Sequence, residues 1–202
     1  MALMYDTIME LPLFKGIGVE QLSLMLEKTS IEFLKFTDGE VIAEAHESVK
    51  AVDFIIKGNV LNIYKMENFP IEIHETLEKG NMIGATRLYG LTTDYGARSV
   101  AVGDVSLMRI EKSQYMNILL SDRIYILNFV NLLSASTQKN QMMMLEQGKP
   151  SIARTLDTLV YTVTSSKRTE KVKVVGSDEA LAAYCGVSVE TFRKFREGND
   201  AD

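Results

Sequence analysis

The sequence contains very few cysteines and histidines, the residues that form disulfides and bind zinc or iron–sulfur clusters. Its 202 residues include a single cysteine, Cys185, so no disulfide can form within one chain. The two histidines, His46 and His74, lie far apart and lack the spaced Cys and His partners of a zinc or iron–sulfur site. No apolar run approaches the length that spans a membrane, and the first residues lack the pattern of a signal peptide. We therefore expect a cytoplasmic protein with no membrane partner.

The sequence also lacks a large excess of positive or negative charge. The formal net charge is -5, which excludes a generally basic protein that coats nucleic acid. A local DNA-binding face remains compatible with this charge, because the local field decides such binding. The chain shows no nucleophile–base pair, metal-ligand spacing or P-loop, so we do not expect an enzyme. Apolar residues make up 46% of the chain, which is sufficient for a packed core.

Residues 1–111 have the pattern of a β-roll or β-sandwich. After a helix expected over 19–28, short β-branched segments such as 52–56 and 60–64 alternate with turn signals. These turn signals include Lys57-Gly58-Asn59 and Val102-Gly103-Asp104. The spacing predicts many short strands in one domain.

Residues 112–147 change to helical periodicity and predict one long helix. The segment from 111 to 145 contains no glycine or proline, and its apolar residues recur in steps of three and four. This heptad-like stripe predicts a dimer interface. The stripe comprises Ile126, Phe129, Leu133, Ser136, Asn140 and Met143. The alternative is a helix that packs on its own sensor domain.

Residues 148–202 begin after a break at Gln147–Pro150 and end in two predicted helices. Ser177 is a plausible N-cap for the first of these helices, and Gly186 can end it in a left-handed conformation. Phe192 and Phe195 return the apolar face of the second helix to a core. This spacing is typical of a helix-turn-helix. Cys185 occupies a core position in the pattern, and the alternative for this residue is a redox switch.

The outer side of the second helix is the candidate DNA-binding face. Side chains near the start of such a helix reach base edges in a major groove. Glu190 can accept a hydrogen bond from cytosine, and Arg193 or Lys194 can donate to guanine or phosphate. The alternative is a small helical hairpin with a solvated charged face. The predicted DNA-binding residues are Ser188, Val189, Glu190, Thr191, Arg193 and Lys194.

Four segments in this order resemble the Crp/Fnr family of bacterial transcription regulators over nearly the whole chain. Phe54–Val60 resembles the strand–turn–strand signature of that family, and Leu77–Gly84 resembles the segment that enters its ligand cassette. Ser151–Leu156 resembles the first helix of its DNA-binding domain, and Asp178–Phe195 resembles its helix-turn-helix.

The resemblance implies an α+β fold with three parts. These are an N-terminal β-roll sensor domain (a double-stranded β-helix or jelly-roll), a long dimerisation helix and a C-terminal winged helix-turn-helix with a truncated wing. It also implies a homodimer that binds double-stranded DNA at a pseudo-palindromic operator, with half-sites about one helical turn apart, and RNA polymerase as a further partner.

The cassette departs from that of family members that bind cyclic AMP. Those members carry a glutamate after the Phe-Gly of the cassette, whereas this chain reads Ile83-Gly84-Ala85; Tyr95 takes the place of their phosphate-binding arginine. A buried phosphate needs charge-assisted partners, so we expect another small effector or none. Haem and iron–sulfur clusters are not expected either. The predicted effector pocket comprises Ile83, Gly84, Ala85, Thr86, Arg87, Tyr95, Arg98, Ser99, Ser136 and Thr137.

A second departure follows the last helix, where the family continues into a β-hairpin wing. Here Glu197–Asp202 follow instead, so strand 171–175 is expected to lack its usual partners. A basic cluster can supply compensating phosphate contacts or form a solvated loop. The cluster comprises Lys167, Arg168, Lys171 and Lys173. The rival interpretation is a sensor or adaptor that binds a small molecule or a protein, with a vestigial helix-turn-helix that does not bind DNA.

Overall fold

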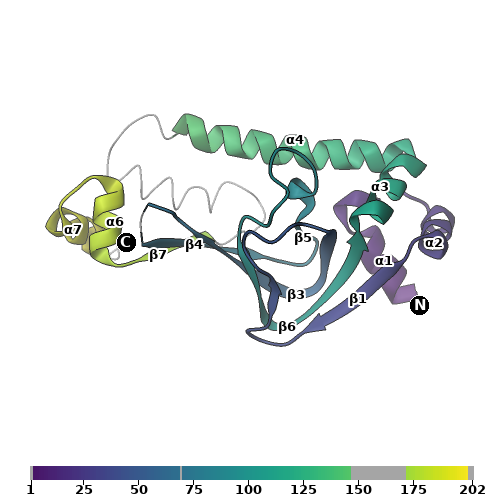
Figure 1. Ribbon diagram of the computed structural model, residues 1–202, viewed down its shortest axis with the longest axis horizontal. Coiled ribbons are helices and arrows are strands. Elements are labelled where there is room, and N and C mark those ends of the chain that lie inside the picture. The colour runs from purple at the N-terminus through teal and green to yellow at the C-terminus, as the bar shows by residue number, and fades with distance from the viewer. Residues whose placement is uncertain (1, 69, 147–171, 200–202) are drawn as a thin grey trace. The chain divides into compact units, whose positions relative to one another are not determined.

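The computed structural model describes residues 2–68, 70–146 and 172–199 (Figure 1). The described residues belong to two units, Met1–Leu61 with Leu77–Thr137 and Asn62–Thr76 with Gln138–Asp202. The helices before the first strand are α1 (Ala2–Met9), η1 (Pro12–Phe14) and α2 (Val19–Lys28). The strands of the first part of the chain are β1 (Ile31–Phe36), β2 (Val41–Ala43), β3 (Ala51–Lys65), β4 (Ile71–Leu77), β5 (Met82–Ile83) and β6 (Arg98–Glu111). The remaining elements are η2 (Ala85–Arg87), α3 (Lys112–Ser121), α4 (Arg123–Glu146), β7 (Val172–Gly176), α6 (Asp178–Cys185) and α7 (Val189–Asn199).

An antiparallel sheet is built around the long strand β6. Strand β1 pairs with its second half, in register from Ile31 opposite Ile110 to Phe36 opposite Val105, and β2 pairs with its first half. The strand order is β1-β6-β3-β4-β7, with β5 paired to β3. The predicted β-roll is confirmed as an antiparallel sheet accompanied by helices.

The sheet of the first unit separates two apolar clusters, because successive side chains of a strand point to opposite faces. Val52, Phe54, Met108 and Ile110 belong to the cluster shared with the helices, which we call the helix-side cluster. The other face carries the roll cluster, whose members include Ile55 and Leu107. The helix-side cluster is rich in aromatic contacts, among them Phe14 with Phe54 and with Tyr125. Helix α2 lies where the sequence predicts it, and buries Leu22 and Met25.

Two helices occupy the segment for which one long helix was predicted. Helix α3 ends at Ser121, Asp122 takes an extended conformation (φ -152°, ψ 141°), and the chain turns by 116° before α4. The Asp122 carboxylate accepts a hydrogen bond from the Ile124 N–H (2.8 Å), which satisfies a donor at the start of α4. A polar cap can therefore break a helix within a run that contains no glycine or proline. The predicted domain boundaries at 111 and 147 stay predictions, and the second lies outside the described residues.

Two glycines predicted to make turns between strands lie inside continuous strands instead. Gly58 has φ +83° within β3, and Gly103 has φ +68° within β6. A Cβ added at Gly58 would clash with the backbone carbonyl of Asp104 on the neighbouring strand β6. The glycine therefore permits a close approach of two strand backbones without ending either strand.

The second unit contains a strand pair and a helix pair. Strand β7 is confirmed near its predicted position, but it has a partner: it pairs antiparallel with β4, from Ile71 opposite Gly176 to Glu75 opposite Val172. A Cβ added at Gly176 would lie 3.2 Å from the Ile71 side chain, so this end of the pairing is tight. The predicted helix over 151–164 and most of the basic cluster lie outside the described residues.

Candidate functional site

The helix pair α6–α7 is defined by local capping interactions. The Ser177 hydroxyl accepts a hydrogen bond from the Ala180 N–H (3.2 Å), which confirms the predicted N-cap of α6. Gly186 adopts φ +69°, and the N–H groups of Gly186 and Val187 donate to the last carbonyls of α6. This left-handed end is the one the sequence predicts at Gly186. Three residues of sequence, from 186 to 188, therefore separate the two helices.

The second helix of the pair is capped in the same way and is held by one aromatic anchor. The Ser188 hydroxyl accepts a hydrogen bond from the Thr191 N–H (3.2 Å) and contacts the Thr191 hydroxyl (2.7 Å). Phe192 is buried, together with Ala180 and Ala182 of α6. Ala182 is buried on α6, where its small side chain leaves room for close packing. The predicted apolar anchor Phe192 is thus confirmed, whereas the side chain of Phe195 is not described.

The outer face of α7 is exposed but its cations are paired. The predicted DNA-binding residues Glu190, Arg193 and Lys194 all lie on the surface. Lys194 Nζ lies 2.9 Å from the Glu190 carboxylate, one helical turn away. Arg193 donates to Asp178 (2.9 Å) and to Glu179 (3.2 Å), the two acidic residues of the first turn of α6. The exposed face is therefore close to neutral.

Asp178 is the centre of this ion-pair network. It also accepts a hydrogen bond from Arg196, and the hydrogen bond from Arg193 lowers the pKa of its carboxyl below the ordinary value of 3.8. The same pairing raises the pKa of Arg193. Asp178 and Glu179 also complement the positive N-terminal end of α6. The network fastens α7 to the start of α6. Burial raises the pKa of the half-buried Cys185 thiol, which disfavours the reactive thiolate.

The predicted effector segment begins with a tight turn at the edge of the roll. Gly84 has φ +82°, and a Cβ added there would lie 2.9 Å from the Val49 side chain and 3.2 Å from the Tyr95 ring. Ile83 and Ala85 on either side are buried. Tyr95 packs against both apolar clusters, and burial raises the pKa of its hydroxyl. These residues form a packed corner of the sheet.

The two arginines of this segment are engaged elsewhere. Arg87 is exposed and donates across its own loop to the Thr92 hydroxyl (3.3 Å) and the Asp94 carbonyl (3.5 Å). Arg98 forms an ion pair with Glu44 (3.3 Å) at the surface. Ser99 is buried on β6, whereas Thr86 is exposed. Of the predicted pocket residues, Ile83, Gly84 and Tyr95 therefore come together, the Arg87 guanidinium lies against Gly96 next to Tyr95, and Arg98 pairs with Glu44.

A charged pair that the sequence analysis did not identify lies beside Tyr95. Asp53 is fully buried on β3, and Arg109 of β6 donates to both of its carboxylate oxygens, at 2.7 and 2.8 Å. Because their neighbours along the strands belong to the helix-side cluster, both side chains face the roll interior. The hydrogen bond with Asp53 raises the pKa of Arg109. The pair therefore places two opposite charges on the face of the sheet that carries the roll cluster.

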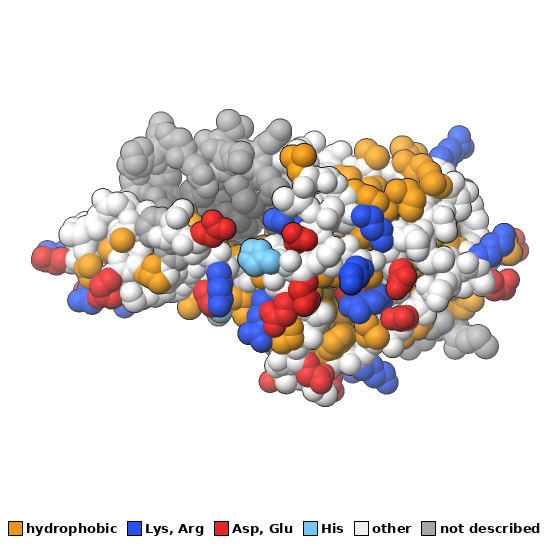
Figure 2. Space-filling model, viewed as in Figure 1, with side chains coloured by type: hydrophobic (Ala, Val, Ile, Leu, Met, Phe, Trp, Pro, Cys, Tyr) orange, Lys and Arg blue, Asp and Glu red, His pale blue; other side chains and the backbone are white. Residues whose placement is uncertain are grey.

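Helix α4 exposes apolar side chains. Ile126, Leu127 and Val130 are 40%, 57% and 48% exposed, and Figure 2 shows hydrophobic side chains gathered along the upper edge, where Figure 1 places α3 and α4. Phe129 instead packs edge-on against Tyr115 of the same chain, at 5.8 Å between ring centroids. Its ring therefore joins the helix-side cluster.

The other predicted residues of α4 belong to the dimer stripe or, in the case of Ser136 and Thr137, to the predicted effector pocket. Leu133 and Ser136 are half-buried, and the exposed Thr137 hydroxyl donates to the Leu133 carbonyl. The side chains of Asn140 and Met143 lie outside the described set.

The described residues contain no group of three or more His, Cys, Asp or Glu side chains placed to hold a metal ion. His46 is exposed, and the His74 ring lies 2.9 Å from the Glu72 carboxylate on the same strand. Within the same described ranges, no single helix is long and apolar enough to cross a membrane; α3 and the first part of α4 meet that criterion only together, across their sharp bend.

Solved structures with the same fold include bacterial regulators. The catabolite activator protein of Thermus thermophilus superposes with a TM-score of 0.58 at 20% identity, over 93% of this chain and 85% of that one. DNR of Pseudomonas aeruginosa superposes with a TM-score of 0.54 at 19% identity, over 99% of this chain and 89% of that one. The chain has a Crp/Fnr-like cyclic-nucleotide-binding fold.

The same fold also occurs outside transcription regulators. A cAMP-binding acyltransferase of Mycobacterium smegmatis matches 70% of this Crp/Fnr-like chain and 42% of its own length, with a TM-score of 0.54 at 18% identity. No protein-family model and no curated protein matches the sequence. At these identities the likeness establishes the fold, and function depends on the site itself.

Proposed function

We propose that this Crp/Fnr-like protein is a transcription regulator that binds double-stranded DNA through the helix pair α6–α7. The observation that carries the proposal is the capped pair itself, with its buried Phe192 anchor and the exposed polar face of α7. In a helix-turn-helix, the second helix enters the major groove and its first residues contact base edges. Ser188, Val189, Glu190 and Thr191 occupy that position here, with Lys194 one turn further on.

The proposal includes a homodimer formed through α4. Ile126, Leu127 and Val130 expose apolar area that a second copy of the helix would cover. A two-fold dimer presents two recognition helices, and therefore selects a pseudo-palindromic operator. RNA polymerase is the partner through which such a regulator would act on transcription.

We infer that the effector is not cyclic AMP. Ile83-Gly84-Ala85 supplies no carboxylate for a ribose, and Tyr95 takes the place of the phosphate-binding arginine. The Arg109 guanidinium near Tyr95 is already engaged by both carboxylate oxygens of Asp53, so it is not available to hold a phosphate. The regulator therefore responds to another small molecule or acts without one, and it is not proposed to be an enzyme.

A second candidate function is supported by the charge of α7. Arg193 is paired with Asp178 and Glu179, and Lys194 with Glu190, so the outer face offers few free cations to a phosphate backbone. This arrangement favours a sensor or adaptor that binds a protein or small molecule and does not bind DNA.

Selection of duplexes from a random DNA library, followed by fluorescence anisotropy on the enriched sequence, distinguishes the two functions. Glu190→Ala or Lys194→Ala should weaken specific binding by about 5-fold to 150-fold, since one base contact contributes about 1–3 kcal/mol. Lys35→Ala, an exposed cation on β1, is the matched control and should bind as the unmodified protein does. Enrichment of no sequence, or equal affinity of all three variants, would favour the adaptor.

A further inference from the structure

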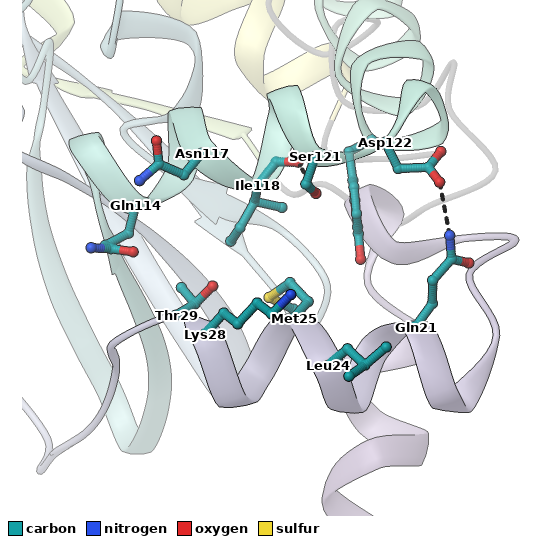
Figure 3. Close-up of a pocket in the computed structure, with 11 residues that line it drawn as sticks. Gln21, Leu24, Met25, Lys28, Thr29, Gln114, Asn117, Ile118, Ser121 and Asp122 are labelled. Carbon is teal, nitrogen blue, oxygen red and sulfur yellow. Dashed lines mark hydrogen bonds between the residues drawn. The ribbon is translucent and has the colours of Figure 1, made fainter.

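A cleft in the first unit shares no lining residue with the predicted effector pocket. It is formed between α2 on one side and α3 with the first turn of α4 on the other, and its volume is about 300 Å³ (Figure 3). That volume lies at the small end of the range of ligand pockets in proteins. The cleft can therefore hold a small molecule.

The cleft has an apolar floor and a polar rim. Met25 and Ile118 are buried at its floor. Three carboxamide side chains, Gln21, Gln114 and Asn117, line it as well. The lining residues are therefore mostly polar, with an apolar patch at the floor, which suits a ligand that carries both charged groups and an apolar side chain.

Tyr125 supplies an unpartnered hydroxyl to this cleft. Its side chain is only 1% exposed, and its ring packs edge-on against Phe14 at 5.9 Å. The hydroxyl is buried and has no hydrogen-bond partner among the described residues. A buried hydroxyl without a partner costs free energy, so a ligand that bonds to it would recover that cost. Burial also raises the pKa of Tyr125, which keeps the hydroxyl neutral.

The two charged residues of the cleft have opposite signs and lie at different ends. The Asp122 carboxylate accepts a hydrogen bond from the Gln21 side chain (2.8 Å), and Figure 3 shows Lys28 reaching toward Met25 from the other end of the cleft. Gln21 and Lys28 are two helical turns apart on α2, which is about 10 Å along the axis. Lys28 forms no ion pair or hydrogen bond within the described part of the chain, so its ammonium is available to a ligand.

We propose that this cleft binds a small zwitterion with an apolar side chain, namely a dipeptide. The carboxylate of the ligand pairs with Lys28 and its ammonium with Asp122. The Tyr125 hydroxyl bonds to a polar group between these ends, and the apolar side chain lies on Met25 and Ile118. A dipeptide extends over about 7 Å. The two-turn separation of Gln21 and Lys28 on α2 is longer than this, and the flexible side chain of Lys28 can cover the difference.

Isothermal titration calorimetry of the full chain without DNA tests the proposal independently of the proposed DNA binding. The probe is alanyl-leucine, compared with its N-acetyl and its C-terminal amide form, and leucine is the control that is too short to reach both charged residues. The dipeptide should bind saturably, and removal of either charge should weaken binding at least about tenfold, the ratio that 1.4 kcal/mol produces. Equal binding of the zwitterion and its capped forms, or no binding of any probe, would overturn the proposal.

Variants of the chain assign the contacts. Lys28→Gln and Asp122→Asn should each weaken binding at least about tenfold, and Tyr125→Phe by about fivefold to tenfold, which corresponds to one hydrogen bond. Asn at 122 keeps the side-chain acceptor for the Ile124 N–H, so α4 should remain capped. Lys35→Gln is the control and should bind with unchanged affinity. Folding of each variant is checked by circular dichroism, and equal losses in the control and in Lys28→Gln would contradict the assignment.

Discussion

Replacing Arg109 by Met would leave the carboxylate of Asp53 buried in the roll without its partner. Asp53 is 0% exposed and accepts both hydrogen bonds of the guanidinium, whereas the Arg109 side chain is 28% exposed. Removing one partner of a buried pair costs about 3–5 kcal/mol, because the remaining charge stays desolvated. We therefore expect Arg109→Met to lower the free energy of unfolding by about 3–5 kcal/mol.

Replacing Asp53 should destabilise the protein less than replacing Arg109, and this difference tests which of the two charges is costly to leave unpaired. In Asp53→Asn the charge that remains belongs to Arg109, which reaches water in part, so we expect a loss of about 1–3 kcal/mol. The double variant Asp53→Leu with Arg109→Met removes both charges and should approach the stability of the unmodified protein, since buried pairs are often neutral relative to apolar residues of similar volume.

Urea unfolding followed by far-ultraviolet circular dichroism measures these differences. In a chain of this size each kcal/mol lowers the melting temperature by roughly 2–4 °C, so Arg109→Met should lower it by about 6–20 °C. Lys35→Met on the exposed face of β1 is the control. A loss below about 1 kcal/mol for Arg109→Met, or a double variant as unstable as that single one, would refute the interpretation that an unpaired buried carboxylate dominates the cost.

Four further predictions concern the helix pair and α4. Phe192→Ala should destabilise the pair by about 3–5 kcal/mol, measured as faster amide hydrogen exchange in α6 and α7; unchanged exchange would contradict its role as the anchor. Gly186→Ala, at φ +69°, should cost about 1–2 kcal/mol in the same measurement. Because the pKa of Asp178 is lowered, its stabilising effect should be complete above its ordinary pKa of 3.8 and be lost as the pH falls through the lower folded value; Arg193→Gln should raise that pKa toward 3.8 in an NMR titration. Leu127→Glu should convert the proposed dimer to a monomer in analytical ultracentrifugation while circular dichroism stays unchanged.

The local features of this chain could be predicted from the sequence because each depends on a few neighbouring residues. The caps at Ser177 and Ser188 and the left-handed Gly186 are signals within one helical turn, and all three are present in the structure. Alternating β-branched segments likewise predict the strands of the roll. Helix α2 is another local pattern that the structure confirms.

Features that depend on distant residues could not be predicted in the same way. Asp53 and Arg109 are 56 positions apart, and only the pairing of β3 with β6 brings them together. The partner of β7 is a strand about 100 residues earlier, which no signal within residues 171–175 specifies. The break at Asp122 does have a local signal, the capping side chain of Asp122 itself, but the apolar residues on both sides also fit one continuous helix.

The paired cations of α7 do not by themselves decide against DNA binding. Exposed ion pairs between flexible side chains are weak and are screened by salt. A phosphate or a guanine that approaches Lys194 can therefore replace Glu190 as its partner at little cost in free energy. The pairing of Arg193 differs, because Asp178 is only 18% exposed and also accepts from Arg196. Arg193 therefore holds α7 to the start of α6, and Lys194 with Glu190 forms the part of the face that the proposed DNA binding would use. Variants of Lys194 should consequently change the affinity for DNA without changing stability, whereas variants of Arg193 should change both.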